Sequence, residues 1–308
     1  MYYVFMKRYY IFLIVCLLFL PLNNAENEKI RVVTTTSITG SIVEDLAGDK
    51  VEVYTIANPS LCPAHYDLKP SDIEIATKAD ILIYQGFEPW VEQIEEELKE
   101  DVVIEKVSGP WNTPENLRKY YRQIASILEE KIDLGDRLQS CLEYINKTDS
   151  ELKKIAEENG FGDIKVCCQE FQKAFVSYLG FNVTISYPSP ETLTSQDIAE
   201  IEEKIREENI KLVISNLQSG TSLGEALEGM GLVHVVLTNF PGTGTELHNM
   251  SAVMMYNAKK LASAVENLGI RSELSLIKSK LQVYEYATFG LIAVAIVEAI
   301  IIWRKNVK

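Results

Sequence analysis

Short β-branched apolar runs alternate with segments whose apolar residues recur at helical spacing along most of the chain. Before residue 113 this pattern predicts strands over 30–35, 51–56, 79–84 and 102–104, with helices over 37–47, 71–78 and 89–100. After residue 160 it predicts strands over 164–168, 182–186, 211–215 and 233–237, with helices over 170–179, 195–208 and 222–230 and a final helix over about 251–268. Strands joined by helices pair in parallel. We therefore expect an α/β fold with two mainly parallel sheets flanked by helices.

A mainly helical stretch over residues 113–159 separates the two alternating regions. Pro114 suits the first turn of a helix, and a break is expected near residues 133–136. The stretch is too long for one crossover, so it predicts a linking segment between an N-terminal lobe, 29–112, and a C-terminal lobe, 160–270. Parallel sheets bind ligands at the carboxyl ends of their strands, and the cleft between the lobes is therefore the expected site.

The two ends of the chain indicate export and membrane attachment. Basic Lys7 and Arg8 precede the apolar run 10–22, which predicts a signal peptide over residues 1–25. Near the other end, residues 287–303 carry a single charge, Glu298, and basic residues follow Trp303. This pattern predicts a single-pass transmembrane anchor over residues 284–303, with the bulk of the chain outside the cell, although a buried core helix is the alternative.

Composition and charge narrow the function. The chain has 308 residues, of which 47% are hydrophobic and 24% charged, so a disordered or polytopic membrane protein is excluded. Acidic residues outnumber basic ones 44 to 30, and the net charge of −14 argues against a nucleic acid partner. The sequence contains no Ser-His-Asp order, phosphate-binding glycine loop or nucleotide fingerprint. We therefore expect a protein that is not an enzyme, with no catalytic residues and no organic cofactor.

Several segments together resemble one known family. The segments are VVTTTSITGSIVEDLAGDKVEV, CPAHYDLKPSDI, KADILIYQGFEPWVEQI, GPWNTPENLRKYYRQIASIL and MMYNAKKLASAV. They are similar to the zinc- and manganese-type metal-binding receptors of ABC importers over about residues 29–268. The resemblance implies two lobes bridged by a long backbone helix, a transition metal ion as cargo, and the permease and ATPase subunits of an importer as partners.

The family's usual metal ligands do not carry over to this sequence. Matching its motifs places Ala64 and Gly109 at the first two histidine positions and Gln169 at the third. The last acidic positions fall near Asn216 and Asn239. A standard site of three histidines and a carboxylate is therefore absent from the sequence.

Cysteine and histidine residues near the lost positions suggest a rebuilt metal site. Cys62 and His65 form a C-x-x-H unit, and Cys167-Cys168 ends the strand beside Gln169. Thiolate and imidazole ligands favour Zn²⁺ or Cu(I), so zinc is the expected cargo at Cys62, His65, Cys167 and Cys168. Other nearby side chains that can complete the shell are Asp67, Glu170 and His248.

Three alternatives stay open from the sequence. Cys62 can instead form a disulfide with Cys167 or Cys168, because exported cysteines are often paired. The cleft can also bind a small organic molecule or a chelated metal through its amide and aromatic residues, which are Gln169, Asn216, Asn239, Trp111 and Tyr66. The third alternative is a structural surface protein whose binding site has decayed. His234, in an apolar strand, is expected to be a core residue, and Cys141 a disulfide partner or a buried free thiol.

Overall fold

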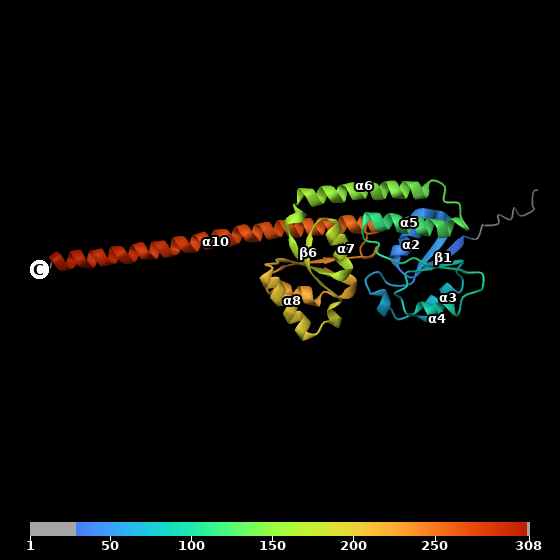
Figure 1. The fold of residues 1–308 in the computed structure, drawn as a ribbon, viewed down its shortest axis with the longest axis horizontal. Coiled ribbons are helices and arrows are strands. Elements are labelled where there is room, and N and C mark those ends of the chain that lie inside the picture. The colour runs from blue at the N-terminus through green and yellow to red at the C-terminus, as the bar shows by residue number, and fades with distance from the viewer. Residues whose placement is uncertain (1–28, 307–308) are drawn as a thin grey trace, which may run out of the picture.

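The computed structural model describes residues 29–306, so the expected signal peptide lies outside the described residues. These residues form two lobes, each built on a four-stranded parallel sheet (Figure 1). The predicted α/β class with two parallel sheets is confirmed.

The N-terminal lobe has the strand order β2-β1-β3-β4, with every pair parallel. Its strands are β1 (Ile30–Thr34), β2 (Val51–Thr55), β3 (Ile81–Tyr84) and β4 (Val103–Lys106), and its helices are α2 (Ser37–Ala47), α3 (Pro70–Ala76) and α4 (Val91–Glu95). Two short 3₁₀ turns, η1 (Gly48–Lys50) and η2 (Pro63–His65), lie in its loops. Helix α4 is much shorter than the predicted 89–100, because glutamates crowd its carboxyl end, where the helix dipole disfavours negative charge.

The C-terminal lobe repeats this plan with the order β6-β5-β7-β8. Its strands are β5 (Lys165–Gln169), β6 (Asn182–Tyr187), β7 (Leu212–Asn216) and β8 (Val233–Leu237). Its helices are α7 (Glu170–Tyr178), α8 (Ser195–Glu207) and α9 (Ser222–Gly229), and the turns are η3 (Phe161–Asp163), η4 (Pro190–Thr192) and η5 (Leu217–Ser219). The two lobes thus present the carboxyl ends of their strands to a common cleft.

Two helices join the lobes. Helix α5 (Pro114–Glu129) begins at Thr113, whose hydroxyl accepts a hydrogen bond from Asn116 N, and α6 (Arg137–Glu158) follows after a turn. Helix α6 runs along both lobes, packing against α2 and α5 at one end and against α10 at the other (Figure 1). A continuous apolar core passes beneath it, from Val32 in β1 to Leu261 in α10. The bridging backbone helix implied by the resemblance is therefore present.

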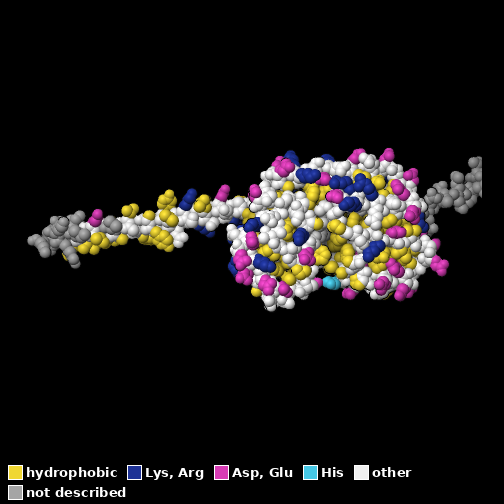
Figure 2. All heavy atoms as spheres, viewed as in Figure 1, with side chains coloured by type: hydrophobic (Ala, Val, Ile, Leu, Met, Phe, Trp, Pro, Cys, Tyr) yellow, Lys and Arg dark blue, Asp and Glu magenta, His cyan; other side chains and the backbone are white. Residues whose placement is uncertain are grey.

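A single helix, α10 (Met250–Asn306), ends the described chain where the sequence predicted two separate helices. No proline interrupts residues 269–283, so the helix continues through them. Its first turns pack against the C-terminal lobe, whereas from Gly269 onward its described side chains are exposed. This outer part projects away from both lobes and carries many apolar side chains (Figures 1 and 2).

Candidate functional site

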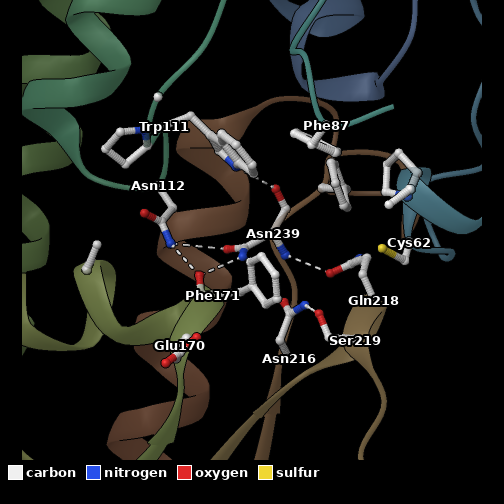
Figure 3. Close-up of a pocket in the computed structure, with 16 residues that line it drawn as sticks. Cys62, Phe87, Trp111, Asn112, Glu170, Phe171, Asn216, Gln218, Ser219 and Asn239 are labelled. Atoms are coloured by element: carbon white, nitrogen blue, oxygen red, sulfur yellow. Dashed lines mark hydrogen bonds between the residues drawn. The ribbon is translucent and has the colours of Figure 1, made fainter. Parts of the chain in front are cut away.

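A cavity of about 400 Å³ lies in the cleft between the lobes. Its walls come from segments that follow the strands of both sheets (Figure 3). The lining residues are Cys62, Pro63, Ala64, Phe87, Gly109, Pro110, Trp111, Asn112, Glu170, Phe171, Ala174, Asn216, Gln218, Ser219, Asn239 and Phe240. A cavity of this size matches small organic ligands, whereas a single metal ion needs far less room.

The positions that the resemblance matches to metal ligands meet at this cavity. Ala64, Gly109, Asn216 and Asn239 all line it, and Gln169 is fully buried beside it. At Gly109 the backbone has φ of 114°, a conformation that a side chain with Cβ rarely adopts. A histidine at this position would therefore require a different loop conformation.

A network of amide groups forms the polar part of the wall. The Gln169 Oε1 atom accepts a hydrogen bond from Asn216 N (2.6 Å). Asn239 N donates to Gln218 Oε1 (3.1 Å), and Asn239 Nδ2 donates to Phe171 O (2.8 Å). The amides hold one another in place, and they make this part of the wall neutral.

Trp111 is the centre of the aromatic part of the wall. Its ring stacks on Phe87 at a centroid distance of 6.1 Å and on Phe240 at 6.2 Å. Tyr120 meets it edge-on at 6.3 Å. Offset stacking of this kind fixes the orientation of the rings and presents flat apolar faces to a ligand.

A buried carboxylate shapes the loop that carries Phe87. Glu88 Oε2 accepts hydrogen bonds from Gly86 N (2.7 Å) and Phe87 N (2.9 Å). Its other oxygen accepts from the Thr35 hydroxyl (2.5 Å) and from Gln85 N (3.2 Å). Glu88 therefore uses both oxygens to position the aromatic wall, and it does not face the cavity.

Hydrogen bonds across the cleft hold the two lobes together. Asn112 Nδ2 donates to Phe171 O (3.1 Å), and Trp111 Nε1 donates to Asn239 O (3.3 Å). On the opposite side, Gln218 Nε2 donates to Pro59 O (2.9 Å). Apart from Pro59, all the residues in these bonds line the cavity, so closure of the lobes and formation of the cavity are coupled.

The first pair of predicted ligands, Cys62 and His65, lies on one loop, but the two side chains do not both enter the cavity. Cys62 lines the cavity, whereas His65 does not. Both border a neighbouring hollow at the cleft rim, where His65 Nδ1 lies 3.7 Å from Glu191 Oε1 of the opposite lobe. The His65 and Glu191 side chains are both more than half exposed, so the contact between them adds little to the free energy of unfolding.

The second pair is not in the cavity. Cys167 and Cys168 are adjacent on β5, so their side chains point to opposite faces of the sheet, and each is fully buried in a different apolar cluster. Burial raises the pKa of Cys167 to about 12, and burial likewise raises the pKa of Cys168. The buried thiols are therefore protonated at neutral pH, while metal ligation requires the thiolate.

The structure thus does not gather the four predicted ligands into one coordination shell. Across residues 29–306, no three His, Cys, Asp or Glu side chains are grouped so that they could hold one ion. Cys62, Cys141, Cys167 and Cys168 form no disulfide in this part of the chain. The metal site at Cys62, His65, Cys167 and Cys168 stays a prediction that needs a rearrangement of β5.

The remaining candidates have separate places. Glu170 lines the cavity, Asp67 borders a hollow on the N-terminal lobe, and His248 is exposed. His234 is nearly buried, and its Nε2 lies 2.9 Å from Ser215 Oγ, consistent with a core role. Tyr66 lies outside the cavity, where its hydroxyl donates to Asp72 Oδ2 (2.9 Å).

Sequence reasoning did not identify several residues that shape the cavity. These are Phe87, Asn112, Phe171, Gln218, Ser219 and Phe240. Each follows the end of a predicted strand, a position that could have drawn attention to it. Residues of these types occur throughout the chain, and the importance of these six depends on what lies opposite them in the fold.

Comparisons with known proteins test the resemblance that the sequence suggested. Residues 32–264 match the family described as "Zinc-uptake complex component A periplasmic". Similar proteins include the manganese ABC transporter substrate-binding lipoprotein PsaA of Streptococcus pneumoniae, 35% identical over 64 residues, and the iron ABC transporter substrate-binding lipoprotein MtsA of Streptococcus pyogenes serotype M1, 32% identical over 76 residues. These matches cover 21% of this chain and of PsaA, and 25% of this chain and 24% of MtsA. The chain thus spans about a quarter or less of the length of these curated relatives.

Solved structures share the fold at low sequence identity. The crystal structure of ZnuA is 17% identical with a TM-score of 0.64, and the periplasmic zinc-binding protein TroA of Treponema pallidum is 16% identical with a TM-score of 0.65. Each comparison covers 77% of this chain, together with 100% of the ZnuA chain and 99% of the TroA chain. The family match spans most of both lobes, and the family consists of substrate-binding proteins, not enzymes. The chain therefore belongs to the family of the periplasmic component A of zinc-uptake complexes.

Proposed function

We propose that this protein is the extracytoplasmic receptor of an ABC importer for metals, and that it delivers its cargo to the permease and ATPase subunits. The family match over both lobes supports the receptor role, and the relatives named for manganese and iron transport support a metal cargo. The cavity lies between the lobes, so separation of the lobes would release the cargo to a permease.

The cargo that this cavity suits best is a transition metal enclosed in a small organic chelator. One observation carries this proposal: the vacated ligand positions border a cavity of about 400 Å³ with aromatic and amide walls. A bare ion requires several charged or imidazole donors at short distance, and the described residues offer no such group. A chelator supplies these donors itself, and its organic surface can pack against the aromatic wall of Phe87, Trp111 and Phe240 and hydrogen-bond to Asn239.

A bare zinc ion is the second candidate. Cys62 and His65 border the same hollow at the cleft rim, and Glu191 approaches His65 from the other lobe. For Cys167 and Cys168 to join them, β5 would have to expose side chains that are now fully buried. Binding through thiolates would release protons and weaken as the pH falls.

Elemental analysis and calorimetry distinguish the two cargoes. The full chain is purified in detergent without chelators, analysed for metal and for released small molecules, and then titrated with Zn²⁺ alone and with zinc–histidine and zinc–citrate complexes. The proposal predicts binding of a complex that Trp111→Ala weakens and that the matched variant His65→Ala does not change. Tight binding of Zn²⁺ alone that is lost in Cys62→Ser would instead establish the bare ion. Release of a metal-free organic molecule would make the cargo non-metallic.

We also propose that the outer part of α10 anchors the receptor in the membrane. Of the helices in residues 29–306, α10 alone is long and apolar enough to cross a bilayer. Residues 284–303 would span about 30 Å, the thickness of the hydrocarbon core. Tyr284, Tyr286 and Trp303 suit the two interfaces, and Arg304 and Lys305 suit the cytoplasmic side. Extraction of the full chain from membranes by detergent but not by carbonate wash tests the anchor.

A further inference from the structure

The stalk of α10, residues 270–288, carries regularly spaced apolar residues that do not pack against its own lobe. Ile270, Leu274, Ile277, Leu281 and Tyr284 follow one another at alternating steps of four and three residues. This spacing is the a/d pattern of a coiled coil, with Leu274 and Leu281 at a and the others at d. Leu274, Ile277 and Leu281 are 50%, 60% and 58% exposed, so a continuous apolar stripe faces solvent.

The lobe leaves this stripe free. Arg271 donates hydrogen bonds to Gly231 O (3.2 Å) and Leu232 O (3.3 Å), and the described residues of α10 beyond it are exposed. From Arg271 to Tyr284 the helix extends by about 20 Å. A second helix can therefore lie along the stripe beyond the point where the lobe ends.

The charges beside the stripe indicate which helix fits there. Glu273 and Lys280 occupy g positions, and Lys278 and Glu285 occupy e positions, so each g residue has an opposite charge five residues later. Within one helix, residues five apart do not face each other as residues three or four apart do. In a parallel coiled coil, g of one helix lies beside the following e of its neighbour. The stripe is therefore complementary in charge to a parallel copy of itself.

The apolar segment beyond the stalk keeps the same register. Seven-residue steps from Ile277 lead through Tyr284 and Leu291 to Glu298, which is the lone charge of residues 287–303. A carboxyl group in hydrocarbon is costly unless it meets a protein partner. At a d position, Glu298 would face the Glu298 of a second copy, and the two carboxyls would hydrogen-bond with at least one of them protonated.

We propose that α10 pairs in parallel with α10 of a second copy of this protein, through the stripe from Leu274 to Tyr284 and the register that continues to Glu298. The pairing is independent of the cargo, since no residue of the cavity takes part. It would place two or more receptors side by side on the membrane with their clefts free. Leu at a with Ile at d favours assemblies of more than two strands, so the measured mass also gives the number of copies.

The first test measures the mass of the full chain in detergent by light scattering and analytical ultracentrifugation. We expect an assembly, which Leu281→Asp converts to a monomer, whereas the matched variant Ser279→Asp on the outer face leaves it intact. Charge reversal in Glu273→Lys should weaken assembly by about tenfold, and adding Lys278→Glu should restore it. A monomeric wild type, or an assembly that both Leu281→Asp and Glu273→Lys leave unchanged, would overturn the proposal.

The second test determines the direction of pairing. In a parallel pair the two copies of residue 277 lie side by side, so Ile277→Cys should form a disulfide-linked dimer under mild oxidation. Ser279→Cys, on the outer face, and the wild-type chain serve as controls for collision and for the native thiols. Equal cross-linking of Ile277→Cys and Ser279→Cys would refute a parallel interface.

Discussion

Replacement of Trp111 tests whether the cleft is held closed by the contacts seen here. Trp111→Phe keeps a ring between Phe87 and Phe240 but removes the N–H that donates to Asn239 O, a loss of about 1 kcal/mol. Trp111→Ala also removes the stack on Phe240, which contributes a further ~1 kcal/mol across the cleft. The closed arrangement should therefore weaken by about fivefold in Trp111→Phe and about 30-fold in Trp111→Ala.

Hydrogen exchange of the full chain in detergent measures this opening locally. The backbone N–H groups of Asn216 and Asn239 donate to Gln169 and Gln218 side chains of their own lobe, and both residues line the cavity, so separation of the lobes would expose these hydrogen bonds to water. Peptides that contain them should exchange faster in the order wild type, Trp111→Phe, Trp111→Ala, while β1 and β3 peptides stay unchanged. Equal exchange in all three proteins, or equal effects of both variants, would show that Trp111 does not hold the lobes together.

Three further predictions concern other parts of the chain. Cys62 is partly exposed and should react with a thiol reagent in the folded protein at pH 8. Cys167 is fully buried, and burial raises its pKa to about 12, so it should react only on unfolding; its reaction without denaturant would contradict the burial. Gly224→Ala should destabilise the C-terminal lobe by about 1–3 kcal/mol, because the added Cβ would overlap His234 and Ser215. Gly229→Ala in the same helix is the control, since its Cβ would contact no atom within 4 Å. Thermal melting of the two variants measures the difference in stability. Burial acts to raise the pKa of Asp149, but hydrogen bonds from Lys153, Tyr178 and Arg118 hold this pKa below its usual value. The ionised carboxylate therefore stabilises the fold above about pH 4, and this stabilisation is lost as the pH falls through the lowered pKa. Asp149→Asn should therefore make the free energy of unfolding fall less steeply as the pH drops below about 4, and an unchanged acid melting profile would contradict this assignment.

The sequence by itself determined the architecture of this protein. Strands such as 30–35 and 211–215 are runs of β-branched and apolar residues, and the helices between them show helical spacing, so local pattern alone predicts parallel sheets. Motifs spread over both lobes indicated the family, and the same resemblance predicts that Ala64 and Gly109, with a position near Asn239, replace ligands of the family. These features are local properties of the chain, and for this reason they can be recognised without the fold.

The cavity, in contrast, depends on contacts between residues far apart in the chain. Only the tertiary structure shows that Trp111 stacks on Phe240 and that Asn112 meets Phe171, because nothing in their local sequence specifies these partners. The same reason limits what the sequence reveals about Cys167 and Cys168, the predicted ligands on β5. Proximity to a lost ligand position is visible in the sequence, but the face of the sheet to which each side chain points, and the apolar cluster that buries it, are decided by packing.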